Sequence, residues 1–178
     1  MTGEVWLDYT VTYLEMTTRP EGPRRPMPAL PGFMVLRAEA PPARWFLHLY
    51  DSVGEGHEWT DWHRRPVAEL EAFIADPEVA IFTVMIQGWT AGFFMLDWRK
   101  AGQCDLAYFG LAPEAQGRGI GAYLLDTAIR TGWAEKGVTR MTVETCTLDD
   151  PRALPMYQRA GFSPIGREDK RRLASASD

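Results

Sequence analysis

The chain has 178 residues, of which 46% are hydrophobic and 24% are charged, and this size and composition are typical of one globular domain in solution. Its net charge is -5 and it carries no basic block, which argues against nucleic acid as a partner. No apolar run approaches the roughly 18 residues of a membrane span, the early acids argue against a signal peptide, and two cysteines, Cys104 and Cys146, give no disulfide framework, so we expect a cytoplasmic protein.

The N-terminal stretch Val5 to Met16 alternates in polarity. Asp8, Thr10 and Thr12 lie on one face, and the apolar and aromatic side chains share the opposite face: Val5, Leu7, Tyr9, Val11 and Tyr13. Alternation with a period of two predicts a half-buried strand.

A loop, a short strand and a helix follow. Arg19 to Pro31 is rich in proline and charge, which favours a loop. Met34 to Ala38 is a candidate strand. Pro41 and Pro42 precede apolar residues at helical spacing, and we expect that helix to end at Gly54.

The next segment, residues 54–65, is dense in tryptophan, histidine and acids and has no regular period. Pro66 then opens a second helix, which Asp76 and Pro77 stop.

Three strands are predicted in the middle of the chain. Val79 to Ile86 is a nearly continuous apolar run, as in a buried strand. Gln87 and Gly88 indicate a hairpin turn into Thr90 to Trp98. After a second turn, Asp105 to Leu111 forms the third strand of this group.

A glycine-rich turn, Gln116 to Gly121, joins that strand to an amphipathic helix running from about Ile120 to about Lys136. A strand, a glycine turn and a helix together aim main-chain N–H groups and a positive helix end at an anion. The turn lacks the Gly-Lys-Ser/Thr of a Walker loop, and Leu124 stands where a dinucleotide fingerprint has its third glycine. We therefore expect the turn to hold the pyrophosphate of a nucleotide-linked cofactor of another class.

The C-terminal part holds a strand, a helix and a last strand. Thr139 to Thr145 is the first strand, Asp150 is the expected N-cap of a helix that ends at Gly161, and Phe162 to Gly166 is the last strand. Residues 167–178 are predicted to be a loose tail. A single α+β domain over residues 1–178 is the simplest organisation.

Two motifs in this half resemble a known family. Gln116-x-x-Gly119-x-Gly121 resembles the acetyl-CoA-binding motif of the GCN5-related N-acetyltransferase (GNAT) superfamily. Asp150-x-x-Ala153-x-x-x-Tyr157-x-x-x-Gly161-Phe162 is similar to the second signature of that family, and the resemblance is clearest over residues 79–166. The Trp59/Trp62 loop and residues 145–149 resemble an uncharacterised bacterial branch.

The resemblance implies a fold and a cofactor. The fold would be a mixed, mostly antiparallel sheet of about six or seven strands, with about four helices and splayed central strands. Acetyl-CoA would be the cofactor. Its implied binding residues are Phe109, Gly110, Leu111, Gln116, Gly117, Arg118, Gly119, Ile120, Gly121, Ala122, Asp150 and Tyr157, and Arg118 either contacts the 3′-phosphate or is solvated.

The resemblance also implies catalytic roles. The Leu111 N–H would polarise the thioester carbonyl, and Tyr157 would protonate the departing thiolate. Tyr157 as a core residue is the alternative. Glu144 would act as a base through water, and a solvated or salt-bridged glutamate is its alternative.

Two positions depart from the family pattern. Position 150 is often Asn in the family and is Asp here, whose charge does not favour a bond to a phosphate, so we expect an N-cap instead. Pro155 lies inside the predicted helix and would remove one backbone bond, so that helix is expected to begin near residue 155 or to be kinked.

The acceptor side rests on weaker patterns. Aromatic residues close to acids indicate an amine-receiving pocket, with core packing as the alternative; the candidates are Glu55, Glu58, Trp59, Trp62 and Tyr108. His57 and His63 lack a third ligand at a metal spacing, so no metal site is predicted, and Cys146 is expected to be an inert thiol.

The resulting hypothesis is an acetyl-CoA-dependent N-acetyltransferase in which a small-molecule or peptide primary amine attacks the thioester directly. A non-catalytic acyl-CoA-sensing module, transfer of a longer acyl group, and a nucleotide-binding structural domain are the alternatives. A homodimer is compatible with the exposed aromatic residues.

Overall fold

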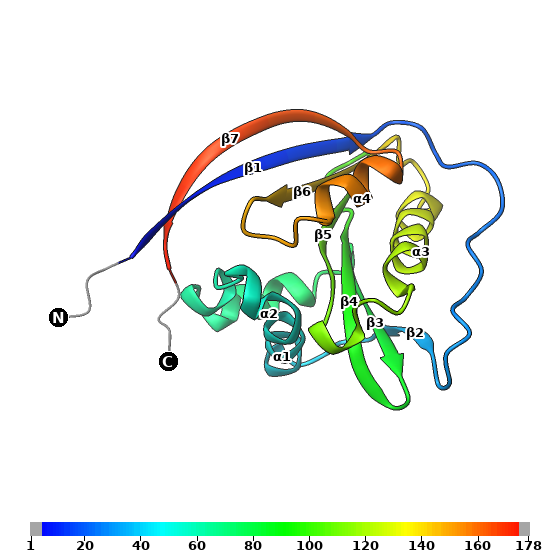
Figure 1. Ribbon diagram of the computed structural model, residues 1–178, viewed down its shortest axis with the longest axis horizontal. Helices are drawn as coiled ribbons and strands as arrows, with labels where there is room; N and C mark the ends of the chain where they lie inside the picture. Colours follow the sequence, from blue (N-terminus) through cyan, green and yellow to red (C-terminus); the bar gives the residue numbers. More distant parts are fainter. Residues whose placement is uncertain (1–4, 175–178) are drawn as a thin grey trace.

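A computed structural model describes residues 5–174 as one seven-stranded sheet with helices on both faces (Figure 1). The strand order is β2-β3-β4-β5-β6-β1-β7, and every neighbouring pair is antiparallel except β5 with β6. This is the mixed, mostly antiparallel sheet that the family resemblance implied. The helices and strands are β1 (Trp6–Met16), β2 (Met34–Ala38), α1 (Ala43–Gly54), α2 (Val67–Ile74), β3 (Val79–Ile86), β4 (Trp89–Asp97), β5 (Gln103–Leu111), α3 (Ile120–Ala134), β6 (Arg140–Cys146), α4 (Ala153–Arg159) and β7 (Ser163–Leu173).

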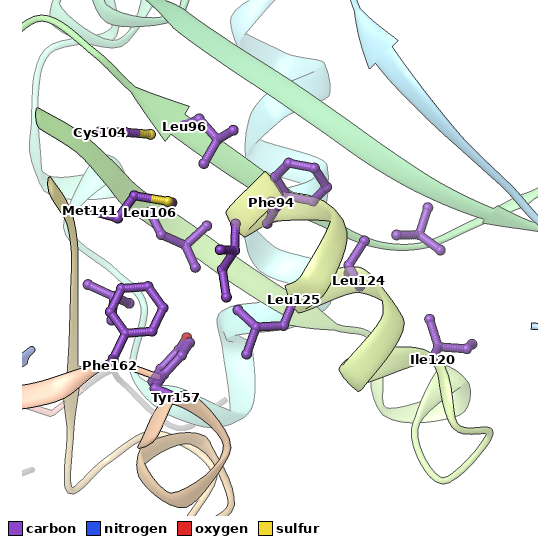
Figure 2. Packing of buried hydrophobic residues seen from close by; sticks show 14 of the residues in the cluster. Phe94, Leu96, Cys104, Leu106, Ile120, Leu124, Leu125, Met141, Tyr157 and Phe162 are labelled. Carbon is purple, nitrogen blue, oxygen red and sulfur yellow. The ribbon is translucent and has the colours of Figure 1, made fainter. Parts of the chain in front are cut away.

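Two hydrophobic clusters lie on opposite faces of the central strands. Helix α3 covers one face, where its buried side chains pack on β4, β5 and β6, as Figure 2 shows for Leu124, Leu125, Phe94 and Leu106. Helices α1 and α2 cover the other face around Phe46. The sheet is therefore buried on both faces at β3 and β4, which explains the nearly continuous apolar runs in their sequences.

Turn chemistry places the strands. Gln87 and Gly88 have φ of 48° and 89°, the pair of positive values that a two-residue type I′ hairpin between β3 and β4 requires. Helix α1 begins after Pro42, whose extended backbone provides the N-cap position as expected. Helix α3 ends at Ala134 because Glu135 is already extended, and Gly137, with φ of 91°, lies in the turn that follows.

The N-terminal strand β1 is inserted between β6 and β7, far from β2 in the sheet. Together β1 and β7 form a long curved ribbon that arches away from the other strands toward the two chain ends (Figure 1). The two faces of β1 have different environments. Leu14 and Met16, which continue the face of Asp8, Thr10 and Thr12, are buried in the core. Tyr9 and Val11, on the opposite face, line a cavity.

The predicted loose tail from Arg167 onward is wrong for most of its length. Residues 167–173 belong to β7 and pair with β1 from Thr12↔Arg167 to Trp6↔Leu173. The charged sequence reads as solvated because most of this strand is exposed. Its partner lies more than 150 residues away in the chain, so no local pattern reveals the pairing. Residues 175–178 lie outside the described residues.

No helix within residues 5–174 is both long enough and apolar enough to cross a membrane.

Candidate functional site

Strands β5 and β6 separate after a short parallel ladder. Only three residue pairs join them, and the last is Asp105 with Thr142. Beyond that pair, β5 continues to Leu111 and β6 to Cys146 without pairing to each other. Strand β5 has a bulge at Ala107, because Met95 pairs with Tyr108 and Leu96 with Leu106, and a bulge bends the strand that carries it. The splayed central strands that were expected are present.

A cavity of about 570 Å³ occupies this opening and extends onto both faces of the sheet. One part of its wall is the glycine turn with the end of β5, and the other part comes from β1, α1, the segment after α1, β6 and β7. Its lining includes Tyr9, Val11, Tyr50, Trp59, Asp61, Tyr108, Phe109, Gly110, Leu111, Gln116, Gly117, Gly119, Ile120, Gly121, Ala122, Glu144, Asp149, Asp150, Arg152, Tyr157, Lys170 and Arg172.

The glycine turn leaves space for a ligand at its main chain. Gly117 and Gly119 both have φ of 74°, and a Cβ added at either position would meet no atom within 4 Å. Gly119 is the N-cap of α3, and no side chain caps the helix. The first N–H groups of a helix have no intrahelical partner, so those of α3 are available to an anion in the cavity.

The two polar residues of the motif differ in placement: Gln116 lines the cavity and Arg118 does not. Gln116 accepts a hydrogen bond from Arg152 Nη2 at 2.7 Å and donates one to the Leu111 carbonyl at 3.4 Å, so it ties the turn to α4 and to β5. Arg118 is exposed and does not line the cavity. Arg152, which the motifs do not mark, contributes a guanidinium to the mouth of the cavity instead.

The open edge of β5 presents main-chain N–H groups to the gap. The Ala112 N–H donates to the Ala91 carbonyl, on the β4 side. Bonds to one neighbour alternate along an antiparallel strand, so the N–H groups of Leu111 and Phe109 point away from β4 and toward the opening. Gly110 is required here for packing, because a Cβ would lie 2.2 Å from Val53 Cγ1.

Tyr157 lies in the cavity wall at the edge of the α3 cluster, next to Phe162 (Figure 2). Its ring makes edge-to-face contacts with Phe109 and Phe162, with centroids 6.2 and 6.1 Å away. Burial raises the pKa of its phenol above the ordinary value. The raised pKa keeps the phenol protonated at neutral pH. Within the described part of the chain, the hydroxyl makes no hydrogen bond, so its O–H is available to a ligand.

The start of α4 corrects two expectations. The N-cap is Arg152, not Asp150, and the helix begins at Ala153. Pro155 is therefore the third helical residue, where the N–H lacks a partner in any helix, and it costs no hydrogen bond. Asp150 instead binds the backbone and guanidinium of Arg152, which lowers its pKa to about 2. Tyr157 is placed by a regular helix.

Three aromatic rings form one wall of the other half of the cavity. Tyr50, Trp59 and Tyr108 lie with centroids 5.4–5.6 Å apart. Burial raises the pKa of Tyr50 to about 12 and that of Tyr108 further, so both phenols are protonated at neutral pH. Trp62 does not line the cavity: it is buried, stacks on Phe73 and donates to the Tyr108 hydroxyl at 2.7 Å.

The acids of the predicted pocket are placed differently from expectation. Neither Glu55 nor Glu58 lines the cavity. His63 lies 2.5 Å from Asp51 and outside the cavity, whereas His57 lines it. Asp61 lines the cavity, although no sequence pattern identified it as a candidate.

Glu144 extends from β6 into the cavity, as predicted. More than a third of the residue is exposed, yet burial raises the pKa of its carboxyl, and the nearby acids Asp149, Asp61 and Glu168 act in the same direction against Lys170. No hydrogen bond to Glu144 is recorded among the described residues. It is thus a carboxylate of increased basicity that faces the opening.

Asp149 is a structural residue that the motifs did not reveal. Its carboxylate accepts hydrogen bonds from Trp59 Nε1 at 3.2 Å, Thr145 Oγ1 at 2.8 Å and the Cys146 N–H at 2.9 Å. It therefore fixes the aromatic wall to the end of β6. The Cys146 thiol lines the same region, and burial raises its pKa, which keeps it protonated.

The family described as Acetyltransferase (GNAT) family matches residues 14–162. No curated protein matches the sequence.

Similar solved structures include a GCN5-related N-acetyltransferase from Sphaerobacter thermophilus, with 18% identity, a TM-score of 0.67, and coverage of 96% of this chain and 53% of that one. A tandem GNAT protein from the clavulanic acid biosynthesis pathway has 14% identity, a TM-score of 0.63, and coverage of 95% and 55%. An aminoglycoside acetyltransferase from an uncultured soil metagenomic sample, in complex with sisomicin, has 16% identity, a TM-score of 0.56, and coverage of 72% and 86%.

At sequence identities of 14–18%, the similarity to these structures shows the fold alone. The chain spans 64% and 53% of the first two structures it matches, so it is shorter than those proteins.

Proposed function

This chain belongs to the acetyltransferase (GNAT) family, and from that premise we propose that it transfers the acetyl group of acetyl-CoA to a primary amine while both are bound. The observation that carries the proposal is the opening between β5 and β6, which lies beside the uncapped N-terminus of α3. A diphosphate fits at the turn, where Gly117 and Gly119 leave open space. A pantetheine arm fits along the free edge of β5.

Bound acetyl-CoA supplies the thioester: the amine nitrogen attacks its carbonyl carbon, the C–N bond forms, the C–S bond breaks, and the sulfur leaves as a thiolate. The residues of this chain assist at three points. The Leu111 N–H donates to the carbonyl oxygen, whose negative charge grows during attack. Glu144 accepts the proton that the ammonium must lose. Tyr157 donates its proton to the sulfur and recovers one from the attacking nitrogen, which loses a second proton as the amide forms; burial keeps the phenol protonated before the thiolate leaves.

Positioning is the main contribution of this cavity. A bound donor and acceptor react as in a unimolecular step, and the gain from this proximity is typically about 7–11 kcal/mol in well-oriented systems. The dry aromatic wall of Tyr50, Trp59 and Tyr108 holds the neutral form of the amine next to the opening. Transfer therefore requires no acyl-enzyme, and the thiol of Cys146 has no part in the reaction.

A panel of primary amines with acetyl-CoA, followed by release of free thiol, tests this function. We expect acetyl-CoA-dependent thiol release with at least one amine. Glu144→Gln should reduce kcat/KM on the order of 100-fold, the usual contribution of a general base, and should shift the pH dependence of the remaining rate. Glu71→Gln, at an exposed position on α2, is the matched control and should have no effect.

Tight coenzyme A binding without thiol release from any amine would instead identify a non-catalytic sensing module. Faster thiol release with a longer acyl-CoA than with acetyl-CoA would identify a different acyl donor and leave the proposed binding site unchanged. A thermal-shift preference for ATP or NAD over coenzyme A would contradict the proposal.

A further inference from the structure

The acceptor half of the cavity has separate poles of negative and positive charge. Of its three acids, Asp149 is fully engaged by three donors and Asp61 is paired with Arg172, which leaves Glu144 as the acid that faces the opening. The two cations both come from β7. Lys170 donates to the Tyr13 hydroxyl and pairs with Glu168. It also acts on Glu144, which leaves Arg172 as the cation of the other pole. A purely cationic amine would interact only with the negative pole, at Glu144.

Arg172 is held rigidly and is incompletely paired. Its side chain is 13% exposed, and the recorded hydrogen bonds all use Nη2, which donates to Thr60 Oγ1 at 2.5 Å and to Asp61 Oδ1 at 3.2 Å. Its Nε is buried and has no partner. Because Nε has almost no accessible surface, a ligand in the cavity would meet Nη1, which takes part in neither of these hydrogen bonds.

The two poles lie well apart. Strand β1 pairs with Glu144 through Tyr13 and with Arg172 through Leu7. Six residues of strand span roughly 20 Å, so even with both side chains extended toward each other, on the order of 10 Å separates the charged groups. An α-amino acid, whose ammonium and carboxylate are neighbours, cannot reach both poles.

The outer end of the cavity is closed by the same part of β7. Arg172 binds Thr60 and Asp61, and Arg64 Nη2 donates to the Leu173 carbonyl at 2.9 Å. The ribbon is thereby attached to residues 60–64, where Figure 1 shows it arching toward α1 and α2. The far end of an acceptor therefore meets a guanidinium and not open solvent.

We propose that the acceptor is an elongated small molecule with a primary amine at one end and an anionic group, carboxylate or phosphate, at the other, and that Arg172 binds the anion. This proposal rests on the acetyl transfer proposed above and adds the class of acceptor. The charged Nη1 group of Arg172 can donate to an oxygen of either anion while Nη2 keeps its bonds to Thr60 and Asp61.

Matched acceptor pairs test the proposal. Triglycine is compared with triglycine amide, and glucosamine 6-phosphate with glucosamine. The anionic member of at least one pair should have a kcat/KM at least about tenfold higher, mainly through a lower KM. The pair that shows the difference tells carboxylate from phosphate.

Variants of β7 separate binding from structure. Arg172→Gln should lower kcat/KM about tenfold more for the anionic member than for the neutral member, and Arg172→Lys should restore part of that difference. Arg171→Gln is the matched control, because Arg171 is the adjacent arginine, is exposed, and pairs with Asp8 outside the cavity. Equal rates within both pairs would overturn the proposal. So would an equal loss for both members in Arg172→Gln, which would make Arg172 only a fastener of the ribbon.

A binding measurement keeps the two proposals distinguishable. Calorimetric titration of N-acetyl-triglycine and its amide into the complex with coenzyme A needs no turnover. Binding that is selective for the acid and lost in Arg172→Gln supports the anion site even if no amine is acetylated, an outcome that would remove the proposed function alone. The absence of any preference for the acid and of any preference within the phosphate pair overturns the anion site.

Discussion

The two walls of the cavity are built in different ways. The cofactor wall comes from one nearly continuous stretch, from Phe109 to Ala122, with Tyr157 added from α4. The acceptor wall is assembled from β1, the end of α1, the segment that follows it, β6 and β7, which lie at opposite ends of the chain. The first wall is set by local backbone geometry and the second by long-range strand pairing.

The difference predicts how each wall responds to change. Backbone conformation at the glycine turn decides the cofactor wall, so a single methyl group should have a large and local effect there. Hydrogen bonds between distant side chains decide the acceptor wall, so substitutions there should change which acceptor is used before they change whether the cofactor binds.

The largest effect is expected at Gly119. Gly119→Ala places a methyl group in the space above the turn and strains a residue whose φ is 74°. We expect coenzyme A affinity and kcat/KM to fall on the order of 100-fold, since a displacement of about 1 Å in a reactive geometry has an effect of that size. Calorimetric titration with coenzyme A measures the loss.

Gly102→Ala is the control for backbone strain. Gly102 has φ of 73° in the turn between β4 and β5, away from the cavity, and its added Cβ would make only an ordinary contact with Thr139 Oγ1 at 3.5 Å. Both variants should lose about 1 kcal/mol of stability, and only Gly119→Ala should lose affinity. Equal affinity in the two variants would contradict the placement of the diphosphate.

A smaller effect is expected at Tyr157, where the two walls meet. Tyr157→Phe keeps the edge-to-face contacts with Phe109 and Phe162 and removes only the hydroxyl. We expect kcat to fall about tenfold to 100-fold, at the lower end of general acid contributions because a thiolate is a good leaving group, and coenzyme A affinity to stay unchanged.

Tyr123→Phe is the matched control on α3, where Tyr123 packs on Phe33 away from the cavity. Single-turnover rates with a fixed amine compare the two variants. An unchanged rate in Tyr157→Phe would assign Tyr157 to the core alone, and protonation of the thiolate would pass to water.

The same contrast explains what the sequence could predict. Gly117, Gly119 and Gln116 carry a local pattern, and the structure places all of them at the cavity. Strands β3 and β4 were also predictable, because burial on both faces leaves a nearly continuous apolar run.

The acceptor wall was less predictable, since its residues carry no local signature. Arg172 lies in a charged run that resembles a solvated tail, and its role depends on pairing with Leu7 and on contact with Asp61. Trp62 and Trp59 are three residues apart in one loop, yet one packs in the core and the other lines the cavity. The start of α4 was misplaced because Pro155 is harmless in a first turn.

The smallest effect is expected at the apex where β5 and β6 separate, and it concerns stability. Asp105 accepts a hydrogen bond from Thr142 at 2.5 Å and lies opposite Asp97. Burial raises its pKa from 3.8 to about 6; the bond from Thr142 opposes the shift, and the charges of Glu144 and Asp97 add to it.

The pH dependence of the stability follows from the direction of the Asp105 pKa shift. Because the folded-state pKa lies above the unfolded value, the stabilising contribution of the protonated Asp105 is complete below about pH 3.8 and is lost as the pH rises through about 6. Two pKa units correspond to about 3 kcal/mol. An asparagine still has to bury a polar amide, so Asp105→Asn should stabilise the protein on the order of 1 kcal/mol at pH 8 and not at pH 4.

Asp97→Asn is the control with the opposite sign, because it removes the carboxylate directly across the β4–β5 ladder. Burial alone would raise the pKa of Asp97, but hydrogen bonds and charge from Arg99 outweigh it and lower the pKa. That variant should be destabilised at pH 8 and less so as the pH falls. Urea midpoints for both variants at pH 4 and pH 8 measure the difference, and equal shifts at the two pH values would show that Asp105 is ionised without penalty.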